Sequence, residues 1–253
     1  STAHMRVVPA LLGWQDPGSA FSAAMQLAAL AAVVSYFWRD VRQVTTGSIG
    51  AVRRGDYNDR WFKLAVAIVL ATLPIGIAGL ALSSTLNACN SPLRGLMVIG
   101  ISCVVMAVLL AVAEVRARHT REVSEMRLRD ALIVGIAQIG ALIPGVSRSG
   151  STLTAALFLN FKREEAARFS FLLGLPAIAL AGLKELWVLL HADMPAHAWP
   201  HLLFGLVVAS LSAFFAIWGL MKFLERFSTW PFVIYRALLG IFLIVAVSTG
   251  LLS

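Results

Sequence analysis

Six apolar stretches of about 20 residues each limit the fold of this chain more than any other feature. They run approximately over residues 21–38, 61–82, 95–113, 169–190, 202–221 and 232–252. A helix needs about 20 apolar residues to cross the hydrocarbon core of a bilayer. With 59% hydrophobic and 13% charged residues, the chain is also too apolar for a soluble domain. The sequence therefore predicts an all-α polytopic membrane protein with six transmembrane helices.

The basic residues predict how these helices are oriented. Sixteen of the 21 Lys and Arg residues lie in four segments between the apolar stretches, at 39–63, 116–129, 162–168 and 222–226. The other connecting segments, at 83–94 and 191–201, carry one Lys or Arg between them. Because cytoplasmic loops are enriched in Lys and Arg, we expect the four basic segments on the cytoplasmic side. This distribution accounts for the net charge of +8 without a nucleic-acid partner.

The apolar segment from residue 131 to 161 has both of its flanks in basic segments, so it must enter the membrane and return on the same side. Its two limbs, residues 131–143 and 150–161, would be about 20 Å and 18 Å long as helices, and the hydrocarbon core is about 30 Å thick. Pro144 and Gly145 interrupt the helix between them. We therefore predict a re-entrant helical hairpin whose tip lies near the membrane midplane.

The tip of this predicted hairpin carries a charge where charge is costly. Arg148 lies within the run PGVSRSGST at residues 144–152, among hydroxyls and glycines. A charged side chain at membrane depth is usually kept for function. The guanidinium and the free amides at the start of the second limb would together favour an oxyanion, and we expect a phosphate group. The alternative is that Arg148 pairs with a carboxylate or snorkels, while the hydroxyls only cap a helix.

Other phosphate motifs do not fit this run. Gly145 and Gly150 have the spacing of a P-loop, but Ser151 stands where that motif requires lysine. No cysteine precedes Arg148 in the run as a phosphatase nucleophile would, so the catalytic group must come from elsewhere in the chain. Glu114 and Glu165 lie at the cytoplasmic edges of apolar stretches, and we expect both to be solvated.

These residues resemble the undecaprenyl pyrophosphate phosphatases, a family of bacterial integral membrane enzymes of the bacitracin-resistance type that recycle the lipid carrier of cell-wall synthesis. The run at 144–152 is similar to the family motif P-G-x-S-R-S-x-x-T. Further matches are STAH at 1–4, DPG at 16–18, FSFLL at 169–173 and YR at 235–236. The resemblance covers essentially the whole chain.

The resemblance implies a phosphatase that removes the terminal phosphate of undecaprenyl (C55) pyrophosphate with the aid of a divalent cation such as Mg²⁺ or Ca²⁺. It implies that Ser147, Arg148 and Thr152 bind the pyrophosphate. We include Ser149 of the tip and Gln138 of the first limb among the substrate-binding candidates. For Gln138, a polar contact between helices is the alternative.

The resemblance also identifies His4 with the essential histidine of the family. His4 would either attack phosphorus or protonate a leaving oxygen, and its unperturbed pKa near 6.5 suits both roles. Ser1 is a further candidate for the attack. Without the resemblance, a histidine near the start of a chain would be read as a solvated surface residue.

Members of the family carry two glutamates, four residues apart, just before the serine that aligns with Ser1. This spacing would place both carboxylates on one face of a helix. The sequence begins inside the motif and without methionine, so we expect an N-terminally truncated chain. Its metal-binding glutamates would then lie upstream, and this truncated form would show little metal-dependent turnover.

The resemblance and the charge pattern suggest an inverted repeat. The first repeat would be residues 1–113 and the second residues 114–253, and each would contain one re-entrant hairpin. Sites in such folds lie near the midplane at the repeat interface and hold anions with half-helix N-termini. A transporter or flippase of an anionic polyprenyl lipid is therefore the alternative function. We expect the bacterial inner membrane as the location, with the active site open to the periplasmic or outer side, and the sequence leaves a homodimer open.

Overall fold

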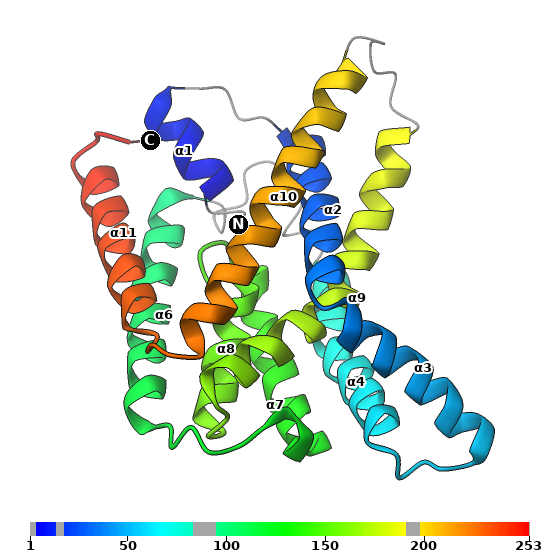
Figure 1. Cartoon of the computed structure of the whole chain (residues 1–253). Helices are drawn as coiled ribbons and strands as arrows, with labels where there is room; N and C mark the ends of the chain where they lie inside the picture. The colour runs from blue at the N-terminus through cyan, green and yellow to red at the C-terminus, as the bar shows by residue number, and fades with distance from the viewer. Residues whose placement is uncertain (1–3, 14–17, 83–94, 191–197, 253) are drawn as a thin grey trace.

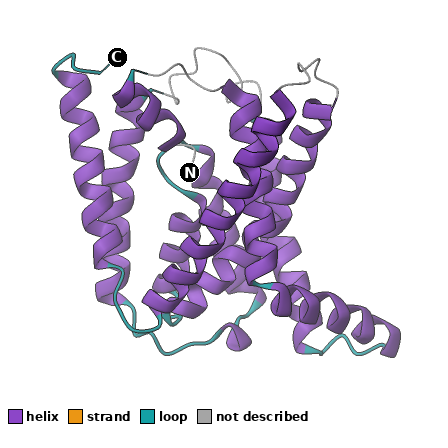
Figure 2. Cartoon of the chain, turned by 45° about the horizontal axis from the view of Figure 1, so that its top comes forward, coloured by secondary structure: helices purple, strands orange, loops and turns teal. Residues whose placement is uncertain are grey.

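The computed structural model describes residues 4–13, 18–82, 95–190 and 198–252, which are almost entirely helical. The long helices are α2 (Gly18–Tyr36), α4 (Arg60–Ala81), α6 (Leu96–Arg116), α9 (Arg163–Leu190), α10 (Ala198–Leu224) and α11 (Trp230–Ser248). The shorter helices are α1 (His4–Leu12), α3 (Trp38–Arg54), α7 (Leu128–Gln138) and α8 (Arg148–Phe158). No β-strand occurs among these residues, so the all-α prediction is confirmed (Figure 2).

Four helices in the described part of the chain are long and apolar enough to cross a membrane. They are α4, α6, residues Leu202–Leu224 of α10, and α11. Large apolar side chains such as Phe204, Leu211 and Phe215 of α10 are more than half exposed, as lipid-facing residues would be. The chain is therefore a polytopic membrane protein. The two other predicted stretches also form helices, α2 and α9, while the count of six crossings stays a prediction.

The short helix α8 lies within the bundle and packs against α6, α7 and α9 (Figure 1). Helices α6 and α11 pack closely along each other, and a Cβ added to Gly240 would lie only 2.7 Å from the carbonyl oxygen of Gly100. Small residues of this kind let membrane helices approach closely. The buried core around α8 includes Leu157, Phe169 and Leu173, each with no exposed surface.

The basic segment at 39–63 contains a helix that the sequence did not reveal. Helix α3 leaves the bundle sideways in both views and packs along α4 (Figures 1 and 2). Asp40 in its first turn and Arg53 and Arg54 in its last turn complement the helix dipole. Gly55 then ends the helix in the left-handed conformation, with φ of 68°.

The predicted helical hairpin is present. Helix α7 continues as a 3₁₀ turn (Ile139–Leu142), residues 143–147 form the tip, and α8 returns. The strand-like contact at its base joins the two flanks, because the Lys162 amide donates to the Arg121 carbonyl at 2.9 Å. The hairpin therefore enters and leaves at the same end of the molecule. Its limbs begin at Leu128 and Arg148, three and two residues earlier than predicted, and its depth in a membrane stays a prediction.

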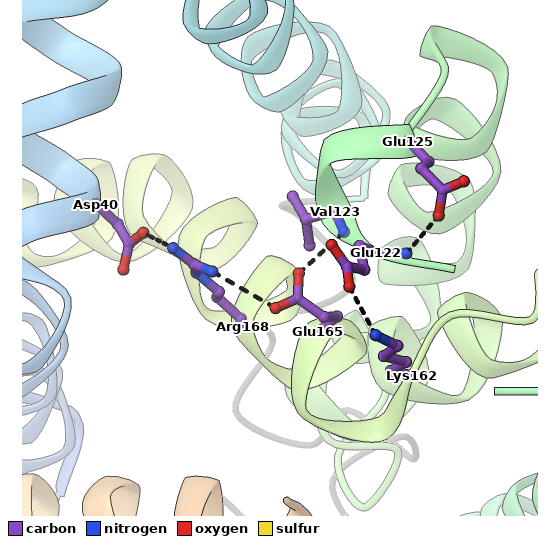
Figure 3. A network of polar contacts seen from close by, with 7 residues as sticks. All are labelled: Asp40, Glu122, Val123, Glu125, Lys162, Glu165 and Arg168. Carbon is purple, nitrogen blue, oxygen red and sulfur yellow. Dashed lines mark hydrogen bonds and ion pairs between the residues drawn. The ribbon is translucent and has the colours of Figure 1, made fainter. Parts of the chain in front are cut away.

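A polar network joins three of the four basic segments (Figure 3). Arg168 of α9 forms ion pairs with Asp40 of α3 and with Glu165, at 3.5 Å for the latter. The other oxygen of Glu165 accepts a hydrogen bond from the Val123 amide at 2.9 Å. The expectation that Glu165 is solvated was therefore wrong, because the sequence does not show which loops its helix approaches.

An exposed ion pair lies at the edge of the same network. Lys162 and Glu122 approach to 2.6 Å, which lowers the pKa of the Glu122 carboxyl and raises the pKa of Lys162. Both groups therefore stay charged at neutral pH. The network brings three of the basic segments together, and the side of the membrane on which they lie stays a prediction.

Glu114 near the end of α6 was also expected to be solvated, and this was wrong. It is 6% exposed. One carboxylate oxygen accepts hydrogen bonds from Arg163 at 2.5 Å and 2.8 Å, and the other accepts one from the Thr229 hydroxyl at 2.9 Å. Glu114 therefore ties α6 to the start of α9 and to the turn before α11.

Candidate functional site

The tip of the hairpin has an unusual backbone. Gly145 has φ of 96° and Ser147 has φ of 66°, in the left-handed region that a residue other than glycine adopts at a cost of about 1–2 kcal/mol. A Cβ added to Gly145 would lie 2.7 Å from the carbonyl oxygen of Ile99, so only glycine lets the tip press against α6. Strained backbone that is held by its surroundings is typical of functional sites.

Ser147 is the N-cap of α8, and its hydroxyl accepts a hydrogen bond from the Gly150 amide at 3.3 Å. The hydroxyl oxygen of Ser149 lies 3.5 Å away, and both serines are exposed. The positive end of the α8 dipole and two hydroxyls are thus presented together. An anion is stabilised at such a position.

Arg148 is the first residue of α8, and its guanidinium is half-buried against α9. Its Nη1 donates to the carbonyl oxygen of Gly174 at 3.0 Å. A Cβ added to Gly174 would lie 3.1 Å from the Arg148 Cζ, so the absence of a side chain at residue 174 leaves room for the guanidinium. Within the described ranges, no carboxylate lies within ion-pair distance of Arg148. The alternative of a structural ion pair thus finds no support in them, and the arginine keeps donors for an anion.

The site contains a second arginine to which the sequence analysis gave no role. Arg236 of α11 is half-buried, and its Nη2 donates to the carbonyl oxygens of Gly145 at 2.7 Å and Val146 at 2.6 Å. A Cβ added to Gly150 would lie 2.3 Å from its Nη1, so the side chain crosses directly over the start of α8. Arg236 lies within a predicted apolar stretch, and this is the signal that had identified Arg148.

His4 at the start of α1 is brought to the same part of α11. Its Nε2 lies 2.5 Å from the Tyr235 hydroxyl, and the two rings are nearly parallel with centroids 5.9 Å apart. Tyr235 directly precedes the arginine that holds the tip, so α11 connects His4 to the hairpin. His4 itself is exposed, and Ser1 lies outside the described residues.

Thr152 and Gln138 lie behind the tip and have no exposed surface. The Thr152 hydroxyl donates to the carbonyl oxygen of Arg148 at 2.9 Å and so closes the first turn of α8. Gln138 differs, because both polar atoms of its amide are buried without a hydrogen-bond partner among the described residues. Such a group costs about 1–3 kcal/mol, so a polar occupant beside Gln138 would be stabilised.

The described residues do not form a metal site by themselves. Among them, no three His, Cys, Asp or Glu side chains come together. The hairpin tip supplies hydroxyls, amides and guanidinium groups, whereas Mg²⁺ and Ca²⁺ require oxygen ligands that usually include carboxylates. The glutamates expected upstream of Ser1 are not part of this sequence.

A family model described as "Bacitracin resistance protein BacA" matches residues 1–242. The chain belongs to the BacA family. A relative from Mesorhizobium japonicum, named undecaprenyl-diphosphatase 2, is 72% identical over 253 residues, which cover all of this chain and 96% of the relative. An undecaprenyl-diphosphatase from Gloeobacter violaceus is 50% identical over all of this chain and 87% of its own length. The predicted resemblance is thus confirmed.

Proposed function

We propose that this chain removes the terminal phosphate of undecaprenyl pyrophosphate and leaves undecaprenyl phosphate. The identity of 72% to a protein named undecaprenyl-diphosphatase 2 supports this activity. The observation that carries it is Arg148, whose guanidinium stands at the start of α8 beside two exposed hydroxyls and without a carboxylate partner in the described ranges. A phosphate group matches both the charge and the hydrogen-bonding capacity of this position.

The terminal phosphate would bind at the start of α8. The free amides of the first turn, the hydroxyls of Ser147 and Ser149 and the guanidinium of Arg148 would donate to its oxygens. Gln138 would supply the buried amide on the opposite limb of the hairpin. Thr152 closes the turn that carries Arg148, and it would reach the substrate only by giving up that bond.

In the reaction, the bond between the bridging oxygen and the terminal phosphorus breaks, and an oxygen from water ends on the released phosphate. Negative charge moves toward the bridging oxygen of the lipid phosphate. A fixed guanidinium that stabilises the transferring group is worth on the order of 10³ in rate. The family's divalent cation, where bound, would neutralise further charge of the pyrophosphate, with carboxylate ligands from outside the described residues.

His4 would act as the nucleophile or as the acid that protonates the leaving oxygen, and Ser1 is the further candidate for the attack. The hydrogen bond to Tyr235 engages Nε2 of His4 and leaves Nδ1 to meet the substrate. A phosphohistidine is stable in base and hydrolyses in acid, so trapping it by rapid alkaline quench would distinguish attack by His4 from proton transfer.

The activity is tested by phosphate release in detergent, where no compartments exist. A version of the chain extended upstream to include the family's two glutamates is incubated with a polyprenyl pyrophosphate and Mg²⁺ or Ca²⁺. We expect metal-dependent release of inorganic phosphate, which chelation abolishes. The transporter or flippase alternative predicts binding of the lipid without release, and that result would overturn the phosphatase proposal.

We also propose the bacterial inner membrane as the location, with the site open to the periplasmic side. The polar network that joins three of the four basic segments supports this orientation (Figure 3). Single cysteines placed at Ser124 and Lys162 should both be labelled from the cytoplasmic side only. Labelling of either from outside would contradict the re-entrant hairpin.

A further inference from the structure

Helix α3 presents an exposed apolar stripe. Trp38, Ile49 and Val52 fall on one side of the helix at 100° per residue, and they are 57%, 49% and 52% exposed. Ala51 on another side of the helix is fully buried. The stripe is therefore not part of the packed interface of α3 within the chain.

A basic row runs beside this stripe. Arg39, Arg42 and Arg53 are exposed and project from the adjoining side of the helix. No ion pair joins any of the three to an acidic residue within the described ranges. An apolar stripe bordered by arginines is typical of a helix that lies in a membrane surface.

The contacts of α3 hold this stripe outward. Asp40 forms an ion pair with Arg168 of α9 at one end of the helix (Figure 3). In its middle, the Ser48 hydroxyl donates to the carbonyl oxygen of Trp61 at 3.1 Å, and a Cβ added to Gly47 would lie 2.7 Å from the Trp61 side chain. Rotation of α3 about its axis would break these contacts, so the stripe and the basic row have fixed directions.

The turn after α3 carries aromatic residues of the kind found at membrane surfaces. Tyr57 is 62% exposed, and its ring packs edge-on against Phe62 with centroids 5.4 Å apart. The Arg60 guanidinium lies 4.4 Å from the ring centre of Trp61. Tyrosine and tryptophan are enriched at the level of lipid headgroups. The residues of the turn, like those of α3, therefore suit the surface of a membrane.

We propose that α3 is a binding surface for anionic phospholipids of the membrane that holds this protein. Trp38, Ile49 and Val52 reach the boundary of the acyl chains, and Arg39, Arg42 and Arg53 bind headgroup phosphates. A second copy of this chain is a poorer occupant, because a symmetric contact through α3 brings two basic rows together. This inference concerns a surface remote from the hairpin tip and does not depend on the proposed phosphatase activity.

The test uses a fluorescent bimane probe on Ile49→Cys in a chain with Cys89→Ser and Cys103→Ala. The protein is placed in phosphatidylcholine vesicles that contain phosphatidylglycerol, and quenching by brominated phosphatidylglycerol is compared with quenching by brominated phosphatidylcholine. Each arginine near an anionic surface contributes about a fivefold preference. We therefore expect a preference of fivefold or more for phosphatidylglycerol at residue 49. A probe on Gln43→Cys, on the side away from the stripe, should be quenched weakly by both lipids.

Two matched double variants distinguish an effect of the arginines on α3 from an effect of the net charge of the protein. Arg42→Gln with Arg53→Gln should bring the lipid preference at residue 49 close to parity. Arg118→Gln with Arg226→Gln removes the same charge from exposed positions off α3 and should leave the preference intact. Equal quenching by the two lipids in the parent chain, or no quenching at residue 49, would overturn the proposal. Energy transfer between probes on two copies would instead show that a second chain covers the stripe.

Discussion

The arginines at the basic end of the molecule and those at the hairpin tip are satisfied in different ways. At the basic end, Arg121, Arg163 and Arg168 each form an ion pair with a carboxylate, from Asp130, Glu114 and Asp40 respectively. At the tip, Arg148 and Arg236 donate to backbone carbonyl oxygens. A carbonyl accepts a hydrogen bond but carries no full negative charge.

This difference separates arginines that hold the structure from arginines that hold a ligand. A buried charge is costly unless an opposite charge or several hydrogen bonds compensate it. The ion pairs at the basic end cancel their charges and join helices. Arg148 and Arg236 together leave a positive charge beside the start of α8, in a part of the molecule where an anionic substrate would compensate it. Substitutions of the two groups of arginines and of their partners should therefore differ in their effect on turnover.

Arg148→Lys should have the largest effect. Lysine keeps the charge but loses the planar arrangement of donors that fits a phosphate. We expect phosphate release by the upstream-extended chain to fall about 10³-fold, with the folded fraction unchanged in size-exclusion chromatography. Arg121→Lys, which keeps its ion pair with Asp130, is the matched control at the basic end and should retain most activity. Near-normal turnover of the Arg148 variant would remove the phosphate-binding role.

Arg236→Lys should have the next largest effect, because it should displace the hairpin tip. A lysine amine cannot span both the Gly145 and Val146 carbonyls while lying over Gly150, so the tip would shift. A displacement of about 1 Å at a reacting centre costs roughly 10²-fold in rate. The loss should appear mainly in kcat, and the double variant with Arg148→Lys should lose less than the product of the two single losses, because both residues serve one unit. Fully multiplicative losses would mean that Arg236 acts independently of the tip.

The sequence predicted the fold class, the hairpin and Arg148 because each depends on local composition. Apolar length predicts helices in a membrane, and a broken apolar segment with basic flanks predicts a return to the same side. The pairing of Glu114 with Arg163 was missed, since the two residues are 49 positions apart in sequence and meet only after α6 and α9 pack. The high density of arginines in 39–63 likewise concealed α3, whose amphipathic pattern is interrupted by glycines.

In the candidate site, too, contacts between residues far apart in the sequence could not be predicted. Arg236 carries the signal of a charge within an apolar stretch, but its role depends on the approach of α11 to the hairpin. The resemblance identified His4, whereas its contact with Tyr235 joins two residues that are 231 positions apart. Neither contact follows from spacing along the chain.

Tyr235→Phe should reduce turnover by a smaller factor. It removes the hydroxyl that holds Nε2 of His4 but keeps the ring that stacks on the imidazole. The loss of one neutral hydrogen bond corresponds to about 0.5–1.5 kcal/mol, or roughly a 2–13-fold decrease in rate. The pH profile of kcat should change as well, since the imidazole loses a partner. Tyr57→Phe, in the turn between α3 and α4, is the matched control, and an equal loss in that variant would show that the effect is general.

Glu114→Gln should have the smallest effect on turnover and a clear effect on stability. The amide keeps the shape of the side chain and can still contact Thr229, but it leaves Arg163 without its opposite charge. Breaking a fully buried pair costs about 3–5 kcal/mol, and the Arg163 side chain is 29% exposed, so solvent should reduce the cost to roughly 1–3 kcal/mol. We expect a lower thermal unfolding midpoint in detergent with unchanged phosphate release per folded molecule at a temperature below that midpoint. Loss of turnover in fully folded Glu114→Gln would mean that the ion pairs of the basic end also position the hairpin tip, and the separation between structural and ligand-holding arginines would then fail.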